Sequence, residues 1–476
     1  MPSAKGHTTA TDSLIQAALR GALTKRQARQ LSQQGPEVVV LTLLAASQRI
    51  AQLQAQGDGQ WPTVSTPSGM VPIYTKPNRP KRSRKPGARR GHQGVRRERP
   101  AKIDRHQTHR LKRCPHCYGR LQRCQRKRTR LIEDIPQDIQ PVVTEHTIHR
   151  DYCPNCKKHV EPVVSDAMPN ATLGHHVIAL TSWFHYGLGI TIDQIVDILG
   201  YHLQTRLTQG GLVNAWQRLA QVLDDWYRQI GEQAKGSGHL HADETGWRVS
   251  GQTHWLWCFA NGQVCYYMID RSRGSPALQK FFTESFEGVL ITDFWRAYDS
   301  VCVDGRQFCL VHLLRELEKV DEKNTSAQWQ GFAKMLRRLI RDAIRLRQRE
   351  DFTPDRYWSR IGRIDQRLGL LADTAYHDKD TERLAKRLSR TRDHLWTFLD
   401  EPSVPFDNNF AERQIRPAVI LRKNSQSNRS EQGAATQAVL MSVYRTLKLR
   451  GHNPTQTIAG ALNTYLQTGQ LPTLPD

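Results

Sequence analysis

The sequence contains no apolar run approaching the roughly 18 residues that a membrane span needs. Its first residues, MPSAKGHTTATDS, lack the apolar stretch of a secretory signal peptide. Cysteine is scarce, with nine in 476 residues, which argues against a disulfide scaffold. We therefore expect a cytoplasmic protein with no membrane partner.

Acidic residues are also in short supply: 45 of them face 69 lysines and arginines, for a formal charge of +24. This excess favours a polyanionic partner, and without a membrane the better candidate is nucleic acid. Sixteen basic residues and only two acids lie between residues 76 and 113. We expect this segment to bind DNA phosphates, although a nuclear localisation signal or a solvated arm has the same composition. The basic residues singled out there are Arg82, Arg84, Lys85, Arg89 and Arg90.

The few cysteines include two CxxC pairs, CPHC (Cys114, Cys117) and CPNC (Cys153, Cys156). Four thiolates in two such pairs suit a closed tetrahedral zinc site, and the β-type residues between them suit a ribbon hairpin. The sequence therefore predicts a structural zinc ribbon, with a redox pair as the alternative. Four nearby residues are substitute ligands: Cys124, His106, His109 and His116.

Helical patterns occupy two regions before residue 236. Apolar residues from Val39 to Leu53 recur at steps of four and three, which predicts a helix that either dimerises or packs on its own domain. The pattern of residues 174–230 predicts three helices. These helices either bind DNA as a helix-turn-helix or only pack together.

From residue 238 the pattern changes to strands. Three aromatic and β-branched runs, HLHADETGWRV, THWLWCFANG and VCYYMIDR, precede a helix and then the apolar strands GVLITDFWRAY and QFCLVH. The order βββαβαβ is that of a ribonuclease H-like fold, which brings a carboxylate of the first strand beside one at the end of the fourth. Asp243 and Asp293 occupy those positions, whereas Glu244 must point to the opposite face.

A third acid follows a long Arg-rich helical stretch, residues 321–400, in the motif PFDNNFAERQIRP. Two-metal phosphoryl transfer needs carboxylates from separate elements, and Glu412 supplies one on a short helix that Pro417 ends or kinks. The structural alternative is a capping box from Asn409 to Glu412 with an ion pair from Glu412 to Arg416. Asp407 and Glu244 are reserve carboxylates.

Together these motifs resemble the transposases of the insertion-sequence-66 type, of the DDE class. The resemblance covers about residues 35–465 and rests on KPGARRGHQG, the CPHC and CPNC pairs, ADETGWRV, ITDFWRAYD, CLVHLLRELE and PFDNNFAERQIRPAVILRKN. It implies an α/β protein whose ribonuclease H-like core is interrupted by an all-helical insertion. It also implies that two Mg²⁺ or Mn²⁺ ions are held by Asp243, Asp293 and Glu412.

Other residues receive roles around this centre. Phosphate contacts are expected from Arg413, Arg416, Arg422 and Lys423, and His312 with Arg315 are candidates to support the metal ligands. Four further cysteines are expected to pack in the core: Cys258, Cys265, Cys302 and Cys309. Core packing is also expected for the tryptophans Trp247, Trp255, Trp257 and Trp295, with stacking on flipped DNA bases as the alternative.

The sequence thus predicts a DNA transposase of a prokaryotic insertion sequence that cuts the element ends and joins them to target DNA. The resemblance implies a homodimer or larger homo-oligomer and leaves open a need for small accessory proteins. The alternatives are a nuclease of the same fold that cuts without joining, and a non-catalytic DNA-binding protein derived from a transposase. The expected regions are 1–60 (helical, dimerisation), 61–113 (basic arm), 114–165 (zinc ribbon), 166–235 (helical, DNA-binding), 236–320 (catalytic core, first part), 321–402 (helical insertion) and 403–476 (catalytic core, second part).

Overall fold

The computed structural model describes residues 101–476 apart from 123–128, 136–138 and 350, together with a few positions between 33 and 43. Most of the helix predicted from Val39 to Leu53 lies outside the described residues, as does Cys124. The five basic residues singled out between Arg82 and Arg90 lie outside them as well.

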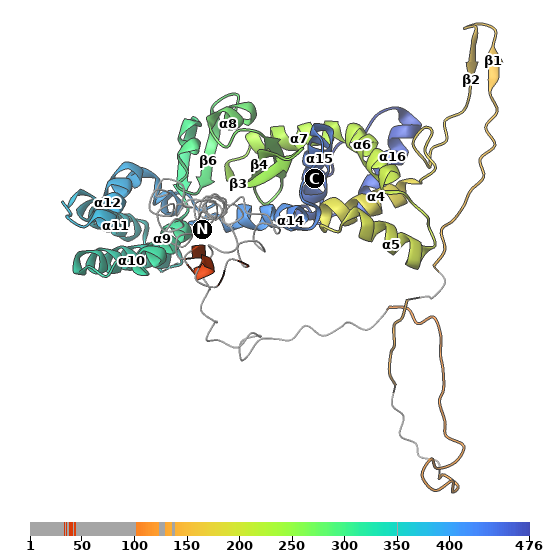
Figure 1. The fold of residues 1–476 in the computed structure, drawn as a ribbon, viewed down its shortest axis with the longest axis horizontal. Helices are drawn as coiled ribbons and strands as arrows, with labels where there is room; N and C mark the ends of the chain where they lie inside the picture. Colours follow the sequence, from red (N-terminus) through yellow and green to blue (C-terminus); the bar gives the residue numbers. More distant parts are fainter. Residues whose placement is uncertain are drawn as a thin grey trace, which may run out of the picture.

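A five-stranded mixed sheet forms the centre of the molecule (Figure 1). Its strand order is β5-β4-β3-β6-β7, in which β3, β4 and β5 pair antiparallel while β6 and β7 run parallel to β3. The chain is therefore a mixed α/β protein, as predicted. The strands are β3 (His239–Val249), β4 (Gln252–Ala260), β5 (Cys265–Asp270), β6 (Phe286–Thr292) and β7 (Val303–Phe308).

The connections differ from the predicted order in two places. The helix α8 (Ser275–Phe281) follows β5 as expected, but the short link between β6 and β7 holds only the 3-10 helix η3 (Arg296–Ser300). The run QFCLVH is not one strand either, because β7 ends at Phe308 and the helix α9 (Leu310–Asp321) begins two residues later. His312 therefore lies in the first turn of a helix.

Helices that precede and follow the sheet in the chain pack together beside it, and α7 (Asp224–Lys235) and α15 (Glu431–Leu449) contact the edge strand β5. Residues 174–235 form four α-helices rather than three, because the expected third helix divides at Leu223. Hydroxyl groups of α15 also occupy the edge of β5, where Ser442 Oγ accepts from Tyr267 N at 2.9 Å and Thr446 Oγ1 from Cys265 N at 3.1 Å. These bonds satisfy strand donors that an open edge leaves unpaired. The helices are α4 (His175–Ser182) with the π-helix η2 (Trp183–Gly187), α5 (Ile192–Leu203), α6 (Gln209–Val222), α7 (Asp224–Lys235), α15 (Glu431–Leu449) and α16 (Pro454–Thr468).

The Arg-rich stretch 321–402 is helical and has a core of its own. Trp329, Phe332 and Leu336 lie in a buried cluster that reaches the sheet at Ile291 and Phe308. Figure 1 shows these helices grouped at one end of the molecule, beside α9. They are α10 (Ala327–Arg347), α11 (Pro354–Asp373), α12 (Lys379–Thr391), η4 (Arg392–His394) and α13 (Thr397–Asp400). The chain then enters α14 (Asn409–Ser425), which packs along β3 and β4.

Most of the expected core residues are buried. Trp247, Trp255 and Trp257 are buried in the sheet, as are Cys258 and Cys265, and Cys309 is buried between β7 and α9. Cys302 is the exception: it lies outside β7 and is exposed. Trp295 is only partly buried and has a different role, described below.

Candidate active site

Two aspartates lie level with each other at the centre of the sheet. The parallel register pairs His239 with Val289 and His241 with Ile291. Continued by two residues, the same register sets Asp243 of β3 opposite Asp293, which directly follows β6. Both residues are partly exposed, so their carboxylates lie where a solvent-borne ligand can reach them.

Glu412 reaches the same region because the start of α14 is anchored to β3. Asn408 is 1% exposed, and its side chain accepts from His241 Nδ1 at 2.9 Å and donates to Ala242 O at 2.8 Å. Burial lowers the pKa of His241 to about 4, so the ring is neutral at pH 7 and its Nδ1–H is the donor. These bonds attach the helix immediately before Asp243 and bring Glu412, one turn on, toward the two aspartates.

The capping box predicted from Asn409 to Glu412 is wrong. Asn408 is the residue before the helix, and its side chain makes no capping bond because it is committed to β3. The helix also does not end at Pro417 but continues to Ser425, with its apolar face against the sheet. The expected ion pair with Arg416 is replaced by one with Arg315, described next.

The carboxylate of Glu412 is paired with groups on α9. Arg315 donates to it through both terminal nitrogens, at 2.8 and 3.3 Å, and His312 Nε2 lies 3.5 Å away. The other ring nitrogen of His312, Nδ1, is buried without a hydrogen-bond partner. Burial also lowers the pKa of His312, so the imidazole is neutral at physiological pH. The two residues singled out beside the motif CLVHLLRELE thus contact the third acid directly.

The three carboxylates act on one another electrostatically. Burial raises the pKa of Asp243 well above its usual range, and Glu244, Asp293 and Glu412 raise it further. The pKa of Asp293 is raised by burial too, with a contribution from Glu412. The side chains do not close around a point, since no cluster of three or more potential metal ligands occurs in the described part of the chain. Their arrangement is that of a negative site whose third member is turned onto Arg315.

Glu244 has separate partners from its neighbour Asp243. It accepts from Arg273 Nε at 3.1 Å and Nη2 at 3.0 Å, and from the Tyr298 hydroxyl at 2.6 Å. The guanidinium of Arg273 lies between two indole rings, 4.6 Å from the centroid of Trp255 and 4.0 Å from that of Trp295. Glu244 therefore anchors the turn that follows Asp293, and Trp295 stacks on an arginine within the protein.

The predicted phosphate-binding residues of α14 fall into two groups. Arg413, Arg416 and Lys423 are exposed, and Arg416 and Lys423 share the helix face that carries Glu412. Arg413 directly follows Glu412 and lies to one side of it, where its Nε donates to Asn409 O at 3.2 Å. Arg422 points the other way, is half-buried, and donates to Thr245 Oγ1 at 3.0 Å and to Gly246 O. Arg416 and Lys423 are placed to meet a ligand beside Glu412, whereas Arg422 ties α14 to β3.

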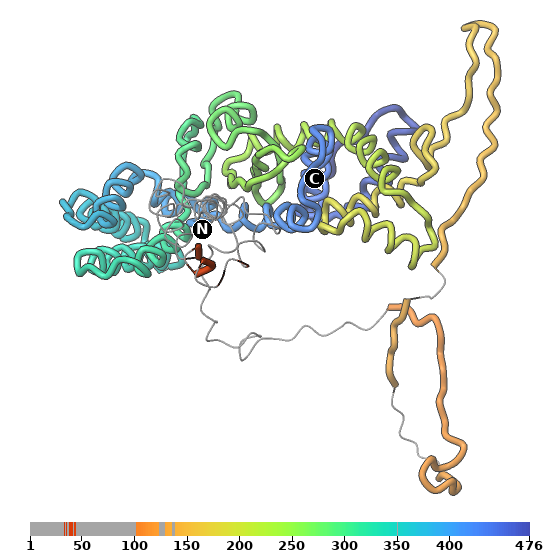
Figure 2. Tube along the Cα trace, in the orientation of Figure 1, coloured from red at the N-terminus to blue at the C-terminus, as the bar shows by residue number. Residues whose placement is uncertain are grey.

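The two CxxC pairs occupy separate parts of the structure. CPNC forms the turn of a hairpin between β1 (Asp151–Cys153) and β2 (Lys158–Val160), while CPHC forms a turn in the segment 101–122. Figures 1 and 2 show this segment well away from the β1–β2 hairpin. Backbone N–H groups within each turn lower the pKa of Cys114 and of Cys153, which favours the thiolate that metals bind. Each pair has the chemistry of half a zinc site, and the four-cysteine site remains a prediction.

Three residues that organise this region were not anticipated from the sequence: Asn408, Arg273 and Tyr298. Asn408 lies in the motif FDNNFAER, but the sequence alone shows neither that its amide is buried nor that its partners are on β3. Arg273 and Tyr298 lie in a loop and a 3-10 helix whose tertiary contacts leave no pattern in the sequence.

No described helix combines the length and apolarity that crossing a bilayer requires. Residues 171–436 match the model of a family described as Transposase IS66 family. Two similar proteins of Sinorhizobium fredii are the uncharacterized proteins y4jD, 28% identical over 211 residues, and y4qI, 25% identical over 281 residues. The matches cover 41% of this chain and 41% of y4jD, and 52% of this chain and 51% of y4qI. The chain thus spans about half the length of these relatives or less. Because the family model spans more than half of the chain, across β3, β6 and α14, the protein belongs to the IS66 family of transposases.

Proposed function

We propose that the protein is a DNA transposase in which Asp243, Asp293 and Glu412 form a centre for divalent cations on a ribonuclease H-like core. The observation that carries this proposal is that acids on β3, directly after β6 and in the first turn of α14 lie near enough to act on one another electrostatically. Asp293 and Glu412 both raise the pKa of Asp243, as like charges in one site must. The strand order β5-β4-β3-β6-β7, with three antiparallel strands and two parallel ones, is the support for this type of core.

The donor set fits Mg²⁺ or Mn²⁺, because hard divalent cations take carboxylate oxygens. Among the described residues, Glu412 is the one of the three acids that forms an ion pair with an arginine, Arg315. Two such ions, when bound, would activate the attacking oxygen and stabilise the leaving one. Glu412 would hold such an ion in place of its pair with Arg315, which would leave the Arg315 guanidinium available to a phosphate group.

The chain's own residues orient the DNA and hold the ligands. Asn408 fixes the start of α14, and Glu244 with Arg273 fixes the turn after Asp293. Arg413, Arg416 and Lys423 present positive charge beside the scissile phosphodiester. Water hydrolyses that bond at each element end, and the freed 3′-hydroxyl attacks a phosphodiester of target DNA in a direct transesterification.

The remaining parts are assigned to recognition. The basic arm 61–113, a zinc ribbon at residues 114–165 and the helices of 166–235 would bind the terminal inverted repeats. A homodimer or larger homo-oligomer would hold both ends, with accessory proteins where the element encodes them. The working location is the nucleoid in the prokaryotic cytoplasm.

Purified protein incubated with labelled DNA carrying the element's own ends and Mg²⁺ tests the proposal. We expect joined products from the wild type, none from Glu412→Gln, and products from the matched control Asp407→Asn, whose carboxylate only accepts from Asn409 N at 3.0 Å. Cut ends without joined products would favour a nuclease. Specific binding without cleavage in any preparation would favour a DNA-binding derivative, and equal activity of wild type and Glu412→Gln would remove Glu412 from the centre.

A further inference from the structure

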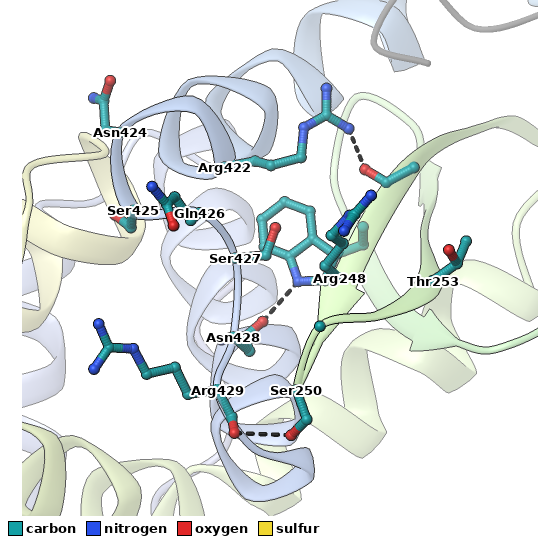
Figure 3. A pocket seen from close by; sticks show the side chains of 13 residues that line it. Arg248, Ser250, Thr253, Arg422, Asn424, Ser425, Gln426, Ser427, Asn428 and Arg429 are labelled. Carbon is teal, nitrogen blue, oxygen red and sulfur yellow. Dashed lines mark hydrogen bonds between the residues drawn. The ribbon is translucent and has the colours of Figure 1, made fainter. Parts of the chain in front are cut away.

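A groove of about 960 Å³ lies at the opposite end of α14 from Glu412 (Figure 3). One wall is the end of β3 with the turn into β4, including Arg248 and Ser250. The other is the end of α14 and the segment that follows it, from Arg422 to Arg429. Figure 3 shows Arg248, Arg422 and Arg429 arranged around the segment from Ser425 to Asn428, and we call this site the arginine groove.

The walls of the arginine groove are held together by hydrogen bonds within the protein. Ser250 N donates to Asn428 O at 3.0 Å, and Asn428 N donates to Arg248 O at 3.1 Å, as in an added strand. The side chain of Asn428 accepts from Trp247 Nε1 at 2.7 Å, and Trp247 is 1% exposed. The groove is therefore a built feature that needs no ligand to form.

Its positive charge is uncompensated. None of the described residues that line it is acidic. In the described part of the chain, the guanidinium groups of Arg248 and Arg429 have neither an ion-pair nor a hydrogen-bond partner. Arg422 uses one terminal nitrogen for Thr245 and Gly246, and burial without a counter-ion lowers its pKa.

The groove also holds spare hydroxyl groups. Ser425 Oγ and Ser427 Oγ are both buried and have no hydrogen-bond partner among the residues that the structure describes. Buried polar atoms are bonded in about nine cases of ten, so two unbonded hydroxyls in one lining need a reason. An oxygen-rich anion would accept from both hydroxyls and from the arginines.

One effect opposes an anion here, because α14 ends at the groove with the negative pole of its dipole. That pole is equivalent to roughly half an elementary charge. Three guanidinium groups outweigh it, and Gln426 N already satisfies one terminal carbonyl, Arg422 O, at 3.0 Å. The balance of charge favours an anion.

We propose that the arginine groove binds the sugar-phosphate backbone of DNA and holds one strand in register with the carboxylate centre. The assignment deepens the proposed function and rests on it for the identity of the polyanion. Glu412 and Arg422 are ten residues apart on α14, a rise of about 15 Å. That span equals roughly four base steps of a DNA strand, and Arg416 and Lys423 lie along it on the exposed face.

Binding of a short labelled duplex in Mg²⁺-free buffer measures the groove without requiring chemistry. We expect Arg248→Gln with Arg429→Gln to weaken binding by on the order of tenfold and to reduce the salt dependence of log K by about 1–2. The matched control is Arg338→Gln with Arg345→Gln, which removes the same charge from exposed positions of α10 and should change binding less than about twofold. Equal losses in the two double variants would overturn the assignment.

Removal of the two serine hydroxyls gives a second test, which distinguishes a role in DNA binding from a role in the stability of the protein. Ser425→Ala with Ser427→Ala should leave the melting temperature of the free protein unchanged or higher, because both hydroxyls are unbonded in it. The same variant should bind duplex several-fold more weakly. Unchanged DNA binding would overturn the assignment, as would a lowered melting temperature that accounts for the loss.

Inorganic phosphate separates a DNA site from a small-anion site. Phosphate that raises the melting temperature of the wild type but not of Arg248→Gln with Arg429→Gln, while both bind duplex equally, would identify a small-anion site and overturn the proposal. If the wild type binds duplex through the arginine groove but never cuts element ends, the groove is a DNA-binding site and the proposed transposase mechanism is wrong. If the protein cuts and joins normally but the groove variants bind DNA like the wild type, the transposase mechanism holds and the groove assignment is wrong.

Discussion

Asp243 and Glu244 are adjacent in β3, yet the fold gives them different tasks. Asp243 meets two other acids and gains no cationic partner, whereas Glu244 is 5% exposed and carries a bidentate bond from Arg273 with a third bond from Tyr298. Alternation along a strand separates their faces. Two adjacent carboxylates in one strand can therefore have different roles, one as a candidate metal ligand and the other in a structural ion pair.

Glu244→Gln should alter how stability depends on pH. Burial, with Asp293 adding to it, raises the pKa of Glu244 from 4.5 to about 7. The folded state then binds more protons than the unfolded state between those values, so the wild type loses stability as pH rises through this window. Between pH 4.5 and pH 7.5, we expect the free energy of unfolding of Glu244→Gln to rise relative to that of the wild type by roughly 1–3 kcal/mol. Denaturant unfolding at a series of pH values measures this difference. A constant difference across this range would contradict the account.

Asn408→Ala should reduce activity because it changes the position of α14, although Asn408 itself is not one of the candidate metal ligands. Its amide bonds to His241 and Ala242 are buried, so truncation leaves two groups unpaired and should cost about 2–4 kcal/mol. The rate of DNA joining should fall by more than the loss of folded protein explains, because Asn408 no longer holds the start of α14, and with it Glu412, against β3. Asn463→Ala, at an exposed residue of α16, is the control, and equal effects of the two substitutions on unfolding would count against the anchoring role.

At the scale of residues, the sequence was sufficient for candidates whose role follows from a strand or motif. Asp243 and Asp293 could be predicted because strand pattern and topology fix their level in the sheet. Asn408 and Arg273 could not, because their partners lie 167 and 29 residues away, at His241 and Glu244 respectively.

Among the elements, β6 carries the site because its register sets Asp293 opposite Asp243. Gly288 makes that register possible: a Cβ there would lie 2.7 Å from Ser237 O and 2.8 Å from Gly238 O, both backbone atoms. The strand can approach the start of β3 only without a side chain at this position.

Gly288→Ala should therefore destabilise the protein by about 1–3 kcal/mol, since the backbone must shift to admit the methyl group. Gly200→Ala is the matched control, because Gly200 is exposed in α5 and a methyl group there would meet nothing within 4 Å, so it should stabilise by about 0.5–1 kcal/mol. Thermal unfolding of both variants measures the pair. Opposite signs are expected, and similar small effects would show that β6 is not held by close approach.

Element boundaries were harder to predict than element types. The strands β3, β4 and β5 follow from their aromatic and β-branched runs, but two helix limits did not. The apolar letters of CLVHLL fit strand and helix equally, and only the helix lets Leu310 and Leu313 pack in one cluster. Pro417 was expected to end or kink the helix that carries Glu412; it does not end α14, because Ile415, Ala418 and Leu421 are buried and the helix continues to Ser425.

At the scale of the whole molecule, the described chain combines a packed α/β body with long segments that carry the CxxC pairs (Figure 2). The formal charge of +24 is concentrated toward the N-terminal third, where sixteen basic residues lie between residues 76 and 113. Composition therefore predicted the class of partner, while the relation between the arms and the body depends on tertiary contacts that composition does not encode.

A zinc measurement tests the expected role of the cysteines. Purified protein should contain about one zinc per chain by elemental analysis, because four thiolates complete one tetrahedral site. Cys153→Ser should lose the metal and weaken binding to element ends, whereas Cys302→Ser, at an exposed cysteine outside both pairs, should keep both. Full zinc content in Cys153→Ser would assign the metal to other ligands.

The most direct test of the central claim is to titrate Mn²⁺ into protein without DNA and follow binding by electron paramagnetic resonance. The account predicts that the wild type and Asp407→Asn bind Mn²⁺ alike, and that Asp243→Asn, Asp293→Asn and Glu412→Gln each weaken binding by at least about tenfold, since each removes a charged ligand. Unchanged Mn²⁺ affinity in all three variants would contradict a shared carboxylate centre.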